Sequence, residues 1–122
     1  MATIVHFDIP ADLPERARAF YGSLFGWKFN YPPGFPDFSL IETTDAQGRP
    51  GLGGGLGRRG EPGQTITMYI GVESVERHLS MIFDAGGSII MPRTVVPGFG
   101  ALALCKDTEG NTFGVWEGVQ QS

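Results

Sequence analysis

The chain is poor in cysteine and in charge. Cys105 is the only cysteine among 122 residues, which excludes an intramolecular disulfide and a zinc site built from cysteines. Charged residues make up only 18% of the chain, and nine Lys and Arg against thirteen Asp and Glu give a net charge of −4. Because this balance offers no positive surface to a phosphate backbone or an anionic membrane, we expect neither nucleic acid nor membrane as a partner.

Long apolar runs and a recognisable signal peptide are also missing, so we expect a cytoplasmic protein. What is present is typical of a globular protein, with 41% hydrophobic and 11% aromatic residues. The length fits one domain, which we place at residues 1–122. Nineteen Gly and nine Pro predict many turns.

The first half of the chain predicts one strand, one helix and three further strands. Residues 3–9 alternate, with Val5, Phe7 and Ile9 on one face and His6 and Asp8 on the other. Asp12 is expected to cap a helix, with Glu15 completing a capping box, and Gly26 is expected to end it. The three strands that follow are predicted at residues 27–31, 38–43 and 51–56.

The second half repeats this order. Residues 65–72 alternate again, and a helix is expected from about Ser74 to a stop at Gly86. Three strands follow, at residues 88–95, 100–106 and 112–117. The repetition predicts an α+β protein of two βαβββ modules, at about residues 1–60 and 61–122. Since one helix covers only one sheet face, the other faces are expected to enclose a pocket or meet a second chain, and we expect a homodimer.

The sequence of elements and three motifs resemble the glyoxalase/bleomycin-resistance/dioxygenase group, also called the vicinal oxygen chelate superfamily. The motifs are VHFDIPAD at residues 5–12, LFGW at 24–27 and DTEGNTFG at 107–114. The resemblance implies curled mixed sheets with helices on their outer faces. It leaves the reaction open, because the superfamily includes isomerases, dioxygenases, epimerases, thiol transferases and metal-free drug-binding proteins.

The resemblance also implies a divalent metal held by side chains on the first and last strand of each module. His6 matches the first of these four positions. The other three positions lack a ligand side chain, and they fall on Thr67 or Met68, on Gly114, and on Leu52 or Gly53. Glu117 lies near Gly114 but shares its face with Phe113 and Val115, which we assign to helix packing. One imidazole does not hold a divalent ion tightly, so we expect no metal of the family type and no other cofactor.

Several side chains are candidates for binding a small organic molecule. Thr67, Tyr69 and Trp116 are predicted on the pocket side of the second module, and Trp27 and Phe38 belong to an aromatic stretch that suits a pocket wall. Glu42 is a further ligand-binding candidate, and with Asp8 it is the residue that would have to replace the missing metal ligands. His78 is expected at the surface. The glycines of residues 51–57 predict close approach of a ligand, the other module or a second subunit to bare backbone.

Two functions remain open from the sequence. The first is metal-independent binding, or an unassigned metal-independent activity, at a cleft lined by sheet. The alternative is a metal-dependent lyase, isomerase or dioxygenase of the glyoxalase type, in which His6 is the catalytic candidate as a general base or ligand. The sequence does not decide whether the chain is an enzyme.

Overall fold

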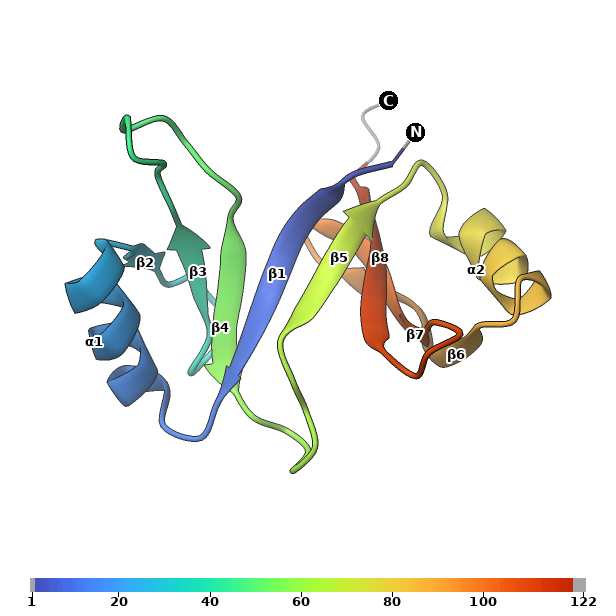
Figure 1. Ribbon diagram of the computed structural model, residues 1–122, viewed down its shortest axis with the longest axis horizontal. Coiled ribbons are helices and arrows are strands. Elements are labelled where there is room, and N and C mark those ends of the chain that lie inside the picture. Colours follow the sequence, from blue (N-terminus) through green and yellow to red (C-terminus); the bar gives the residue numbers. More distant parts are fainter. Residues whose placement is uncertain (1, 120–122) are drawn as a thin grey trace. The chain divides into compact units, whose positions relative to one another are not determined.

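The structure, a computed structural model, describes residues 2–119 and has the predicted order of elements, βαβββ followed by βαβββ (Figure 1). The first module consists of β1 (Ile4–Ala11), α1 (Pro14–Phe25), β2 (Lys28–Asn30), β3 (Ser39–Glu42) and β4 (Gly54–Arg58). The second consists of β5 (Thr67–Gly71), α2 (Val75–Asp84), β6 (Ser88–Val96), β7 (Gly100–Lys106) and β8 (Thr112–Gly118). The predicted fold class is confirmed. Neither described helix is long and apolar enough to cross a membrane.

The chain divides into two compact units. The N-terminal unit is His6–Ile66, and the C-terminal unit comprises the described residues from Thr67 onward together with those up to Val5. Strand order is β2-β3-β4-β1 in the N-terminal unit and β5-β8-β7-β6 in the C-terminal unit. In both, the first strand of the module pairs in parallel with the last, and the remaining pairs are antiparallel. The two units therefore share one plan.

The core of the N-terminal unit lies between α1 and one face of its sheet. Phe7 and Ile9 of β1 contribute to it as the alternation predicts. Trp27 packs against this core, and its ring stacks on that of Tyr21 from α1, with centroids 4.8 Å apart and planes at 6°. The buried centre of the cluster consists of Ile9, Ala11, Ile41 and Leu56.

The predicted cap of α1 is wrong. The helix begins at Pro14, its N-cap residue is Leu13, and no side chain caps it. Proline suits the first helical position because its fixed φ is already helical and its missing N–H is not needed there. Asp12 instead accepts a hydrogen bond at Oδ1 from Nε of Arg59, at 2.9 Å. The carboxylate of Asp12 is thus engaged in an ion pair with Arg59, and it does not form the predicted capping box.

The core of the C-terminal unit lies between α2 and strands β7 and β8. Ser74 caps α2 as predicted, and its Oγ accepts a hydrogen bond from the backbone N of Arg77 at 3.2 Å. Burial raises the pKa of the Cys105 thiol, which keeps it protonated. The buried side chains of this core are those of Val75, Leu79, Ala103, Cys105 and Val115.

The strand predicted at residues 51–56 begins later, at Gly54, and continues to Arg58. Residues before it form a connection to Thr43 instead: the backbone N of Gly51 donates to the carbonyl of Thr43 at 2.9 Å, and Thr43 Oγ1 donates to the carbonyl of Leu52 at 2.7 Å. The parallel pairing of β1 with β4 runs to Ala11 opposite Arg58, which extends β1 beyond its predicted end.

Candidate functional site

One face of the C-terminal unit brings together the three residues predicted there. In the register of β5 and β8, Tyr69 lies opposite Gly114 and Gly71 lies opposite Trp116. Thr67, Tyr69 and Trp116 therefore share the sheet face away from Val115 and α2. Leu102 and Leu104 of β7 lie opposite Trp116 and Gly114 and add apolar surface to the same face. A binding role for these residues stays a prediction.

Gly114 occupies the position that the family resemblance assigns to a metal-binding carboxylate. A Cβ added at this glycine would run into the ring of Tyr69, which is itself only 6% exposed. The aromatic ring thus fills the space into which a side chain at position 114 would project. A carboxylate cannot be placed there without displacing Tyr69.

Glu117 lies on the helix side of β8, as its parity predicts. Its Oε1 accepts hydrogen bonds from the backbone N of Val75 at 2.9 Å and from Nε of Arg93 at 3.1 Å. The hydrogen bond from Arg93 lowers the pKa of this carboxyl, and the bond from the Val75 amide lowers it further. Glu117 is therefore committed to the start of α2 and to Arg93, and it does not replace the missing ligand at Gly114.

A different group of side chains meets in the N-terminal unit. His6 Nε2 lies 2.8 Å from Asp8 Oδ1, and both side chains are about one-third exposed. Asp8 lies opposite Gly55, and a Cβ at Gly55 would come within 2.6 Å of both Asp8 Oδ1 and the ring of Phe38. The glycine run was expected to let a ligand, the other module or a second subunit approach its backbone. At Gly55, side chains of the same unit occupy that space.

Two other candidates in this unit lie elsewhere. The ring of Trp27 belongs to the aromatic cluster beneath α1, 5.8 Å from that of Phe7, and so lies on the helix side of the sheet. Glu42 is exposed on β3, opposite Lys28 of β2. Strand β4 separates β3 from β1, which places the backbone of Glu42 about 10 Å from β1. The unit brings His6, Asp8 and Phe38 together, without Trp27.

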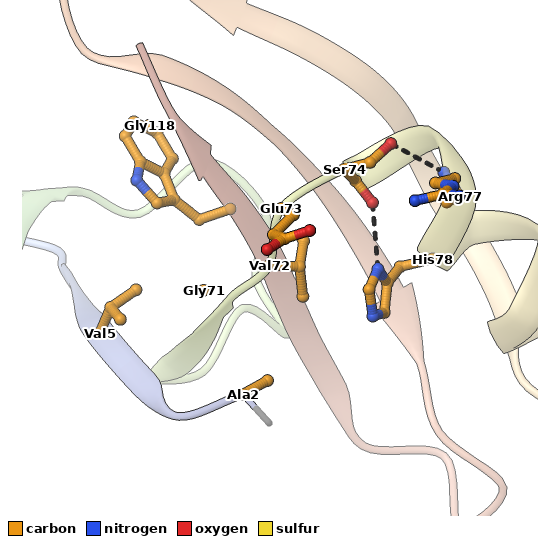
Figure 2. Close-up of a pocket in the computed structure, with 10 residues that line it drawn as sticks. Ala2, Val5, Gly71, Val72, Glu73, Ser74, Arg77, His78 and Gly118 are labelled. Atoms are coloured by element: carbon orange, nitrogen blue, oxygen red, sulfur yellow. Dashed lines mark hydrogen bonds between the residues drawn. The ribbon is translucent and has the colours of Figure 1, made fainter. Parts of the chain in front are cut away.

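A pocket of about 600 Å³ lies in the C-terminal unit at the carboxyl ends of β5 and β8, where the chain enters α2 (Figure 2). Trp116 forms part of its wall, together with Val5 and Val72. The polar part of the wall consists of Glu73, Ser74, Arg77 and His78. Ligands commonly bind at the carboxyl ends of parallel strands, and this location makes the pocket the main candidate site.

The sequence predicted only Trp116 among the pocket residues. His78, expected at the surface, is half-buried, and its Nδ1 lies 3.0 Å from the carbonyl O of Ser74. No motif in the sequence points to Arg77 or Glu73. Their position in the sequence is the signal that could have found them. Glu73, Arg77 and His78 lie between the end of a predicted strand and the first turn of the helix that follows it, which is where ligands commonly bind.

Comparisons with known proteins give one family and one fold. Residues 3–44 match the family described as bleomycin resistance protein-like N-terminal. A glyoxylase-like domain-containing protein from Didymella fabae is 32% identical over an alignment of 115 residues, and the match covers 88% of this chain and 88% of the relative. Among solved structures, a hypothetical protein from Bacillus halodurans is similar with a TM-score of 0.73 at 14% identity, covering 99% of this chain and 97% of the other.

A methylmalonyl-CoA epimerase from Streptomyces coelicolor, solved in complex with 2-nitronate-propionyl-CoA, has a TM-score of 0.72 at 12% identity. The match covers 96% of this chain and 97% of the epimerase. At identities of 14% and 12%, these two structural matches show only that the fold is shared.

Proposed function

The chain belongs to the glyoxalase/bleomycin-resistance/dioxygenase group, the vicinal oxygen chelate superfamily, and on that basis we propose that it binds a small organic molecule without the superfamily's metal. The observation that carries the proposal is the contrast around Trp116. Its indole lines a pocket of about 600 Å³, whereas two residues earlier the family's ligand position is Gly114, covered by Tyr69.

The donor set does not fit the superfamily's divalent ion. Within residues 2–119, neither unit gathers three His, Cys, Asp or Glu side chains in a metal-binding arrangement. His6 is paired with Asp8, and Glu117 is paired with Arg93 on the helix side of its sheet. Leu52 and Gly53 carry no donor atom. We therefore assign no chemical step to a metal.

The pocket wall supports capture of a partly apolar molecule. Trp116 is half-buried, so one part of its ring is packed while another remains available for stacking. Leu102 and Leu104 continue the apolar face beside it. Thr67 and Tyr69 are buried on the same face of the sheet. A ligand with a flat or aliphatic body would bury its apolar area here.

Ligand binding by Trp116 tests the proposal directly. In a Trp27→Phe background, Trp116 is the only tryptophan and its fluorescence reports on the pocket. We expect aromatic small molecules to change this fluorescence saturably, and Trp116→Ala to weaken their binding, measured calorimetrically, by tenfold or more. Trp27→Phe alone should bind as the parent does. Stoichiometric metal in purified protein, lost in His6→Ala, would overturn the metal-free assignment.

The alternative function is an enzyme that uses His6. The observation in its favour is the Asp8 carboxylate at 2.8 Å, which orients the imidazole as a base requires. A metal-dependent lyase, isomerase or dioxygenase has less support because, within residues 2–119, no third His, Cys, Asp or Glu joins His6 and Asp8 in a metal-binding group. Turnover of a 2-oxoaldehyde–thiol adduct or a catechol that His6→Ala abolishes would favour the enzyme.

The homodimer and the cytoplasmic location belong to the same proposal. Apolar side chains remain exposed on both units, including Phe20 and Leu24 of α1 and Met81 of α2. Patches of this kind suit a subunit interface. A sharp monomer mass of 13.2 kDa in solution would contradict the dimer.

A further inference from the structure

We propose that the pocket beside Trp116 selects a small monocarboxylate with an apolar body, whose carboxylate lies against Arg77. The proposal rests on the proposed function, because it names the ligand class for the same pocket. It is carried by three features of the wall: the unpaired guanidinium of Arg77, the separation of polar from apolar side chains, and the net charge of the lining.

Arg77 differs from most arginines of the chain in having no carboxylate partner. Arg59 pairs with Asp12, Arg58 with Asp37 and Arg93 with Glu117. Within residues 2–119, the guanidinium of Arg77 has neither an ion pair nor a hydrogen bond, and only its backbone N is engaged, by Ser74. A guanidinium that lines a pocket and lacks an internal partner can bind a carboxylate of a ligand through two parallel hydrogen bonds.

The pocket is divided into an apolar and a polar part. Figure 2 shows the side chains of Ala2 and Val5 across the pocket from Ser74, Arg77 and His78, with Val72 and Glu73 between them. The indole of Trp116 belongs to the same lining as Val5 and Val72. A ligand that fills this space needs an apolar body at one end and a polar group at the other.

The charges of the wall limit the polar group to a single negative charge. Arg77 and Glu73 contribute one charge of each sign to the lining. The N-terminus of α2 adds little for an anion, because the carboxylate of Glu117 already accepts from its first amide, at Val75. Phosphates and dicarboxylates would bring a second charge that Arg77 cannot neutralise and Glu73 repels. A monocarboxylate meets neither obstacle.

His78 lines the same pocket next to Arg77. A carbonyl oxygen only accepts hydrogen bonds, so the contact with Ser74 O requires Nδ1 of His78 to carry the proton. This contact fixes the ring and leaves Nε2 of the neutral imidazole as a hydrogen-bond acceptor, which does not bind a carboxylate. The carboxylate of the ligand is therefore held by Arg77.

The test compares one skeleton with and without the charge, namely 3-phenylpropionate and 3-phenylpropionamide, by calorimetry and Trp116 fluorescence in the Trp27→Phe background. We expect the carboxylate to bind roughly tenfold more tightly than the amide. Arg77→Gln should remove most of this difference, because it weakens binding of the carboxylate more than binding of the amide. Arg77→Lys should restore part of it, since lysine keeps the charge without the paired donors.

Two further variants complete the design. Glu73→Gln should strengthen carboxylate binding a few-fold, because it removes a like charge from the wall. Arg16→Gln, on the exposed side of α1, is the matched control and should change nothing. Circular dichroism checks that each variant is folded.

The outcomes separate this inference from the proposed function. Equal binding of carboxylate and amide, both lost in Trp116→Ala, would overturn the ligand class and leave the binding function intact. A preference for the carboxylate that survives Arg77→Gln would overturn the role of Arg77. Binding of neither probe would contradict the ligand class, and saturable binding of uncharged aromatic compounds would then decide whether the function itself stands.

Discussion

Asp8 lies opposite Gly55 in the N-terminal unit, and Tyr69 lies opposite Gly114 in the C-terminal unit. The two positions correspond by strand parity, since each side chain comes two residues after the first-strand ligand position, which is His6 in one module and, by the same parity, Thr67 in the other. In both units the side chain of the first strand covers a glycine of the last strand. One unit places a carboxylate there, the other an aromatic ring.

This difference gives the two units different chemistry on one backbone plan. Asp8 engages His6 and keeps a titratable pair on its sheet face. Tyr69 is buried and makes the corresponding face apolar, while the polar residues of its unit gather at the strand ends around the pocket. The two modules therefore share the pairing of their strands, whereas the side chains at corresponding positions differ in their chemistry.

Substituting the two glycines should have the largest effect and tests the comparison directly. Gly114→Ala places a Cβ against the buried ring of Tyr69 and is expected to cost about 3 kcal/mol of unfolding free energy. Gly55→Ala meets Asp8 and the half-buried ring of Phe38, which can shift, and should cost about 1 kcal/mol. Chemical denaturation measures both.

Gly118→Ala is the matched control on β8, because a Cβ there meets nothing within 4 Å. It should leave stability almost unchanged. In a Tyr69→Ala background, Gly114→Ala should cost less than it does in the parent, as a coupling between contacting residues requires. An equal loss of unfolding free energy in Gly55→Ala and Gly114→Ala would contradict the comparison. It would mean that the side chains over Gly55 are as rigid as the ring of Tyr69 over Gly114.

The shared plan and the faces of the strands could be predicted from the sequence, whereas most of the pocket could not. Alternation in residues 3–9, 65–72 and 112–117 depends only on the pleat, so it predicted the faces of Phe7, Tyr69 and Trp116 correctly. Asp12 satisfied the local pattern of a cap, but its carboxylate pairs with Arg59, which is 47 residues away. Local patterns carry no information about such distant partners.

The same limit applies to the aromatic and polar candidates. Trp27 follows a helix stop in an aromatic stretch, and only the packing of α1 decides that its ring stacks on Tyr21. Arg77 and His78 lie on a predicted helix without any motif. Their importance arises from the end of β5 and from Trp116, which the chain brings to them from nearly forty residues away.

The starts of the two helices extend the comparison, because a distant carboxylate binds the first amide of α2 and none caps α1. Glu117→Gln should therefore cost about 1 to 2 kcal/mol, through the loss of charge-assisted hydrogen bonds to Val75 and Arg93. Glu61→Gln, at an exposed carboxylate of the N-terminal unit, is the control and should cost nothing measurable.

Acid should reveal the same bond. The pKa of Glu117 is lowered in the folded state, so its contribution to stability is present above the ordinary glutamate pKa of about 4.3 and is lost as the pH falls through the lower folded value. Denaturation curves from neutral pH down to about pH 3 should converge for parent and Glu117→Gln. A constant gap between them would contradict the role given to this carboxylate.

The smallest effects are expected from the local caps, and they should have opposite signs in the two units. Ser74→Ala removes the Oγ that accepts from the Arg77 amide and should destabilise the protein by about 1 kcal/mol. Leu13→Ser introduces a hydroxyl at an exposed, extended N-cap residue that has no capping bond, and should stabilise by about 0.5 kcal/mol. Thermal unfolding resolves both, and destabilisation by Leu13→Ser would mean that the Leu13 side chain, rather than a missing cap, determines how α1 begins.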